Sequence, residues 1–89
     1  MSQDLLEDAS DRLRVAAEKT EGDTRQRLSD QADSLAALAT QEHGADHGRL
    51  ARHMHALAEL ADETEGPARE AVREARSTLA TFREGVDGV

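Results

Sequence analysis

The sequence predicts an all-α protein, an antiparallel four-helix bundle built from two repeated αα-hairpins. Three observations lead to this prediction. Apolar residues recur at intervals of three and four, glycines interrupt that pattern at three places, and the second half of the chain resembles the first. The predicted helices span about residues 4–20, 24–42, 47–64 and 67–84.

The first hairpin begins at a capping box. Asp4 and Glu7 are spaced so that each side chain can accept a backbone N–H at the start of a helix. Gly22 can adopt the left-handed conformation that commonly ends helices, and Asp23 has the form of an N-cap for the second helix. The apolar stripes of these two helices contain Leu5, Leu6, Ala9, Leu13, Ala16 and Ala17, then Leu28, Ala32, Leu35, Leu38 and Ala39.

The second hairpin follows Gly44, where the helical pattern is interrupted. Asp46 is the expected N-cap of the third helix, which ends at Glu65 and Gly66. Pro67 suits the first position of the fourth helix, because the N–H that proline lacks is not needed there. The apolar stripes contain Leu50, Met54, Leu57 and Ala61, flanked by His53 and Leu60, then Ala68, Ala71, Val72, Ala75, Leu79 and Phe82.

A shift of 44 residues aligns the two hairpins. Nine of the 33 pairs between residues 6–38 and 50–82 are identical, including a shared turn with the pattern Thr-Glu-Gly-x-x-Arg. Turns carry no heptad bias, so this shared turn favours a duplicated αα-hairpin within a single domain, residues 1–89. The Glu and Arg of the turn are four residues apart and are expected to form an exposed ion pair.

The composition predicts a thin core and an acidic surface. Sixteen alanines accompany ten leucines, and Phe82 is the only aromatic residue, so little apolar area is available for burial. Without cysteine, a disulfide cannot compensate, and we therefore expect a homodimer or a protein partner. The formal net charge of −8 disfavours binding to nucleic acids. Abundant acid with a single lysine is typical of a halophilic cytoplasm, where molar salt screens self-repulsion.

Other functional classes find little support. No apolar stretch is long enough to span a membrane, and the acidic N-terminus is not a signal peptide, so we expect a cytoplasmic protein. The serines lack the neighbours of a catalytic nucleophile, and no phosphate-binding glycine loop is present, so we expect no enzymatic activity and no cofactor.

Four histidines gather at the joint between the hairpins, within residues 43–55. One alternative function is metal binding by His43 and His47, whose spacing of four residues can place two ligands on one helix face. However, Gly44 lies between them, and no recognised metal motif is present. A second alternative is phosphotransfer or regulation through His55, which the helical wheel places opposite the Leu50 and Leu57 stripe. The residues after His55 lack the basic and glycine residues that usually follow a phospho-accepting histidine.

Two stretches resemble a known family. The segment from Asp46 to Arg52, Asp-His-Gly-Arg-Leu-Ala-Arg, and the tail from Phe82 to Val89 are similar to those of small acidic haloarchaeal proteins of unknown function. This resemblance implies an all-α cytosolic protein made of paired hairpins. It implies no activity, cofactor or site residue.

The sequence therefore predicts a non-enzymatic protein-interaction or assembly module. Its expected interaction surface lies at the start of the second hairpin, where histidines are added to the repeated pattern. The residues expected to form it are Asp46, His47, Arg49, Arg52 and His55.

Overall fold

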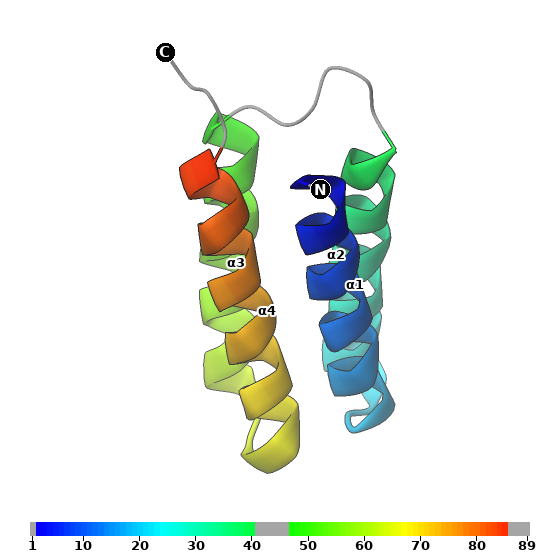
Figure 1. Cartoon of the computed structure of the whole chain (residues 1–89). Helices are drawn as coiled ribbons and strands as arrows, with labels where there is room; N and C mark the ends of the chain where they lie inside the picture. The colour runs from blue at the N-terminus through cyan, green and yellow to red at the C-terminus, as the bar shows by residue number, and fades with distance from the viewer. Residues whose placement is uncertain (1, 41–46, 86–89) are drawn as a thin grey trace.

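The protein is a bundle of four helices. The computed structural model describes residues 2–40 and 47–85, and in these residues it contains helices α1 (Ser2–Glu18), α2 (Gly22–Ala39), α3 (His47–Glu63) and α4 (Gly66–Gly85), without strands (Figure 1). The predicted all-α bundle is confirmed. Gly44, the expected N-cap Asp46 and the last two residues of the predicted second helix lie outside the described residues.

Two helical hairpins lie side by side along the long axis of the bundle (Figure 1). The molecule measures 38 × 20 × 18 Å, which is close to the dimensions of four short antiparallel helices. Helix α1 packs extensively on both α2 and α4, and α3 packs on α4, whereas α2 and α3 form the weakest of the four contacts between neighbouring helices. The bundle is therefore closed on three sides and comparatively open between α2 and α3.

The core follows the predicted apolar stripes. Their most deeply buried large side chains include Leu6, Leu13, Leu28, Leu35, Leu50, Leu57, Val72 and Leu79. Alanines such as Ala9, Ala32 and Ala75 lie between these larger side chains and are also fully buried. Small residues let the helix backbones approach closely, so a core with few large side chains still closes. Phe82 is 6% exposed and belongs to the same cluster.

The predicted start of the second helix was wrong by two residues. Gly22 has φ +66° and begins α2, instead of ending α1, and Gly66 with φ +56° begins α4 in the same way. Helix α1 ends at Glu18, and the backbone N–H groups of Lys19 and Thr20 bond back to its carbonyls. The extended Glu21, rather than Asp23, is the N-cap residue. Glycine adopts positive φ without strain, so the chain reverses within a few residues.

The second turn is closed by an arginine in a way that sequence spacing did not predict. Arg69 Nε donates a hydrogen bond to the Ala61 carbonyl oxygen at 2.8 Å, so the guanidinium caps the end of α3 instead of pairing with Glu65. The last carbonyls of a helix lack backbone partners, and a cation there also complements the helix dipole. None of the helices in the described part of the chain is long and apolar enough to cross a membrane.

Candidate functional site

Three of the residues predicted to form an interaction surface, Arg49, Arg52 and His55, are exposed on the first turns of α3. We call these three residues the basic strip. Residues 47–58 contain no acidic side chain, which is unusual in a chain with a net charge of −8. His47 begins α3, but Asp46 and His43 lie outside the described residues. The strip therefore places two arginines and a histidine on a stretch of α3 that has no acidic side chain.

The interface between α2 and α3 is held by polar contacts. His53 Nδ1 lies 2.7 Å from Gln31 Oε1, and Arg27 Nη1 lies 2.7 and 2.8 Å from the two carboxylate oxygens of Glu63. Both contacts join the two hairpins across the open side of the bundle. Since the Arg27–Glu63 pair is exposed, it contributes little to stability and serves mainly to align the helices.

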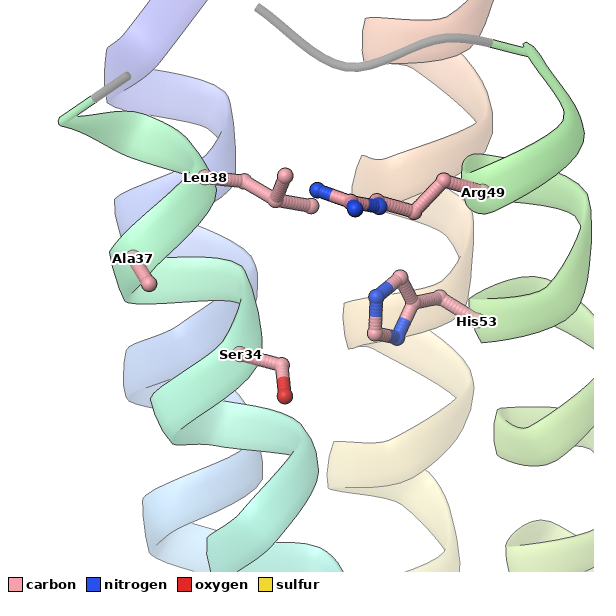
Figure 2. Close-up of a pocket in the computed structure, with 5 residues that line it drawn as sticks. All are labelled: Ser34, Ala37, Leu38, Arg49 and His53. Carbon is pink, nitrogen blue, oxygen red and sulfur yellow. The ribbon is translucent and has the colours of Figure 1, made fainter.

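A cleft of about 210 Å³ lies in this interface, and we call it the α2–α3 cleft. Its described lining residues are Ser34, Ala37, Leu38, Arg49 and His53. Figure 2 shows that the side chains of Arg49 and His53 extend from α3 toward α2, and that the Ser34 hydroxyl points back toward α3. Two nitrogen-bearing side chains and one hydroxyl thus converge on one hollow. None of the described lining residues is acidic.

The 44-residue alignment explains why the cleft is on this side. Applied to the cleft, it pairs Leu38 with Phe82, Arg49 with Leu5 and His53 with Ala9. The partners Leu5, Ala9 and Phe82 all belong to the apolar core or pack against it, on the side where α1 and α4 are in extensive contact. The cleft therefore lies where Leu38 takes the place of a phenylalanine, and where Arg49 and His53 take the places of two apolar residues.

The environment of His53 favours its neutral form. Partial burial lowers the pKa of His53 below the ordinary value of 6.5, and the positive charges of Arg49 and Arg52 lower it further. Because Gln31 Oε1 can only accept a hydrogen bond, Nδ1 carries the proton of the neutral ring, and Nε2 offers a lone pair. His53 is thus a neutral imidazole at pH 7 that can become a second donor when it gains a proton.

We expect the stability of the fold to depend on His53 between neutral and mildly acidic pH. In the unfolded chain His53 takes up a proton near pH 6.5, whereas in the folded chain protonation requires a lower pH. The contribution of His53 to stability is therefore fully present above pH 6.5. It then declines as the pH falls toward the lowered folded pKa. Urea unfolding gives the free energy of unfolding of the wild type and of His53→Gln at each pH from 7.5 to 5. The difference between the two proteins is the decline that His53 causes.

Taking that difference removes the contribution of the many carboxylates, which both proteins share. The matched control is His55→Gln, which removes an exposed histidine of the same helix and keeps His53. This control keeps His53, so its profile should still differ from that of His53→Gln. Parallel profiles for the wild type and His53→Gln would contradict the depressed pKa of His53.

The two alternative functions predicted from the sequence depend on His55 and on the pair His43 and His47. His55 is exposed, as the helical wheel predicts, with a side chain 80% accessible and Nε2 3.9 Å from Glu59 Oε2. Exposure alone does not favour phosphotransfer, because an unburied histidine is common on helix surfaces. The side chains of His43 and His47 are not among those that the structure describes. The described residues contain no group of three or more potential ligands that could hold a metal ion.

Sequence reasoning missed Gln31 and Ser34, the two α2 residues that face the basic residues of α3. Gln31 is equivalent to the fully buried Ala75 in the repeat. Its departure from the repeated pattern mirrors that of His53, which replaces Ala9. A comparison of the two copies at core positions was the signal that could have identified this polar pair.

Comparisons with known proteins give one match. The model of a family of unknown function, DUF7553, matches residues 1–85. Neither the curated proteins nor the solved structures contain a match. The match agrees with the resemblance to a family of unknown function.

Proposed function

We propose a role for this chain from its own surface, because it belongs to DUF7553, a family of unknown function. The chain is a non-enzymatic protein-interaction or assembly module of a halophilic cytoplasm, and its partner is a second copy of itself. The observation that carries this proposal is the basic strip of Arg49, Arg52 and His55 on a protein with a formal net charge of −8. A local positive surface on an acidic chain is complementary to the remainder of that chain's own surface.

Helix α1 offers the complementary surface. Its side chains Glu7, Asp11 and Glu18 are exposed, and Glu7 and Asp11 are one helical turn apart. The arginines of the basic strip are three residues apart, so both surfaces present charges at about 5–6 Å intervals. In a two-fold symmetric dimer, α3 of each copy would meet α1 of the other, and each contact would form twice.

Salt should determine when this association occurs. Two chains of charge −8 repel each other over tens of ångströms in dilute buffer, whereas at molar salt the Debye length is about 3 Å. Close ion pairs across an interface are screened less than the long-range repulsion. Dimerisation is therefore expected to strengthen between 0.1 and 2 M KCl, which is consistent with a protein adapted to high salt.

A charge swap tests the proposed contact. Arg52→Glu and Asp11→Arg should each weaken dimerisation at 2 M KCl by roughly ten-fold or more, because each places like charges opposite one another. The double variant Arg52→Glu/Asp11→Arg should recover most of the loss, since the ion pair is re-formed with reversed polarity. Sedimentation equilibrium over a range of protein concentrations measures all four dissociation constants.

The matched control is Arg73→Glu, which makes the same charge change at an exposed position of α4. Its dissociation constant should remain close to that of the wild type. A wild-type protein that stays monomeric at every salt concentration would refute the self-association. A dimer that is weakened equally by Arg52→Glu and Arg73→Glu would refute the assigned surface.

A further inference from the structure

We propose that a groove between α3 and α4 binds a free amino acid, with its carboxylate held by Arg73 and Arg76 and its ammonium group held by Asp62. This groove, which we call the α3–α4 groove, has a volume of about 220 Å³ and is lined by Ala58, Ala61, Asp62, Arg73 and Arg76. It lies within the second hairpin, where α3 packs along α4 (Figure 1). The proposal does not rest on the proposed self-association, because the groove contains no residue of the basic strip.

The groove is lined from the interior of both helices. Ala58 is eleven residues past the start of α3, and Arg76 is nine residues before the end of α4. Nine residues correspond to about 14 Å along a helix. The walls of the groove are therefore far from both ends of the described segment 47–85.

Three arginines of α4 form a row along α3. Arg69, Arg73 and Arg76 follow one another at intervals of four and three residues, so they share one face of α4. Arg69 Nε donates a hydrogen bond to the Ala61 carbonyl oxygen at 2.8 Å. Arg76 Nε donates one to the Met54 carbonyl oxygen at 3.2 Å. Arg73, between them, makes no hydrogen bond or ion pair with any residue that the structure describes, and it faces the groove instead.

The two helices place opposite charges on the two sides of the groove. Helix α3 contributes Asp62, which is exposed and whose carboxylate is in no hydrogen bond or ion pair with a described residue. Helix α4 contributes Arg73 and Arg76. An ion pair requires a nitrogen–oxygen distance of about 4 Å or less, so the Asp62 carboxylate and the Arg73 guanidinium are farther apart than that. A molecule that carries both charges can bridge them, whereas Asp62 would repel a simple anion.

A free amino acid has the charges that this arrangement requires. A guanidinium can donate two parallel hydrogen bonds to one carboxylate, and Arg76 keeps donors for this purpose because Met54 engages only its Nε. The ammonium group of the ligand can donate hydrogen bonds to the Asp62 carboxylate. Ala58 and Ala61 are short and apolar, so they leave room for the aliphatic part of the ligand. The volume equals that of several liquid waters at about 30 Å³ each, which suits a small amino acid.

The first hairpin carries different residues at the equivalent positions. Ala58 aligns with Arg14 and Ser77 aligns with Asp33, while Arg73 takes the place of a serine. In the first hairpin Arg14 Nη2 lies 3.1 Å from Asp33 Oδ1, so a long side chain and its ion pair join α1 to α2 there. The second hairpin has two small residues instead, and it has added an arginine beside the space that they leave.

An NMR titration of the full chain with glycine tests the site. The protein is dilute, and KCl is adjusted to keep the ionic strength constant. We expect saturable shifts of the backbone amides of Ala58 and Ala61 and of the Nε–H signal of Arg73. Acetate carries the carboxylate alone and methylammonium the ammonium alone, so each should bind at least about ten-fold more weakly than glycine. Shifts that do not saturate, or acetate that binds as tightly as glycine, would overturn the proposal.

Neutral substitutions on the two sides distinguish an amino acid from a simple anion. Asp62→Asn should weaken glycine binding about ten-fold, because it removes the partner of the ammonium group. For a simple anion the same substitution would strengthen binding, since it removes a repulsive charge. Arg73→Gln should also weaken glycine binding about ten-fold. Both residues are exposed, so both variants should remain folded, which thermal unfolding checks. Unchanged or tighter glycine binding by Asp62→Asn would refute the assigned role of Asp62.

The matched controls make the same charge changes in the first hairpin. Asp23→Asn and Arg25→Gln alter exposed residues that do not line the groove. Both variants should bind glycine as the wild type does. Losses equal to those of Asp62→Asn and Arg73→Gln would indicate diffuse attraction and refute a defined site.

A blocked variant tests the position of the site. Ala58→Arg/Ser77→Asp introduces the residues of the Arg14–Asp33 pair into the second hairpin without changing the net charge. The longer side chain should fill the groove and abolish the saturable shifts. If this variant binds glycine as tightly as the wild type, the site is not in the α3–α4 groove and the proposal is wrong.

Discussion

Replacing Leu13 or Leu57 by alanine is expected to lower the free energy of unfolding by about 2–5 kcal/mol. Both side chains are 0% exposed, and they occupy equivalent positions in the two copies of the hairpin. The loss combines the transfer of the leucine side chain with the cavity that remains. Because the surrounding core contains many alanines, few neighbouring side chains are long enough to fill that cavity.

The effect is large relative to the whole stability of the domain. At about 0.05–0.15 kcal/mol per residue, a chain of this length is stable by roughly 4–13 kcal/mol, so either substitution removes a substantial fraction. Urea unfolding followed by circular dichroism at 222 nm measures the loss. The control is Val15→Ala on α1, where the side chain is 44% exposed and the cost should be below about 0.5 kcal/mol.

The comparison of Leu13 with Leu57 also tests the repeat. If the two hairpins are equivalent modules, the two losses should agree more closely than the spread of about 2 kcal/mol that is found among buried leucines in general. A cost below that of Val15→Ala for either leucine would contradict the position of the core. A cost confined to one of them would show that the two hairpins contribute unequally to a common core.

The sequence was sufficient to predict the helices and the residues that each one buries. Helical periodicity depends only on local spacing, and Leu6, Leu28, Leu50 and Val72 are buried as that spacing requires. The turns were less predictable. Gly22 was expected to end α1, but a glycine with positive φ can also begin a helix after a tight reversal, and spacing alone does not distinguish these uses.

The candidate site was predictable only in part. Exposure of His55 followed from the helical wheel, because it lies opposite the Leu50 and Leu57 stripe. The pairing of His53 with Gln31 did not, since periodicity assigns a face to each helix but does not say which helices are adjacent or how closely they pack. That information required the three-dimensional arrangement, in which α2 and α3 approach least.

Restoring the repeat at the cleft is expected to stabilise the protein. The triple variant Leu38→Phe/Arg49→Leu/His53→Ala introduces the residues of the α1–α4 side into the α2–α3 side. It fills the hollow with apolar area and removes a partly buried imidazole, and full burial of a large apolar side chain is worth about 1.5–3 kcal/mol. After allowance for imperfect packing, the free energy of unfolding should rise by about 1–3 kcal/mol.

The control for this variant is Arg52→Leu/His55→Ala, which removes the same two kinds of side chain from exposed positions outside the cleft and makes the same change in net charge. Its stability should remain within about 0.5 kcal/mol of the wild type. A triple variant no more stable than this control would contradict the view that the cleft weakens the fold.

A stabilised triple variant would show that the residues that open the bundle between α2 and α3 lower the stability of the fold. The extensive packing of α1 on α4 shows that the same repeated hairpin can pack closely. The open side is therefore a departure from the repeat that the thin core tolerates.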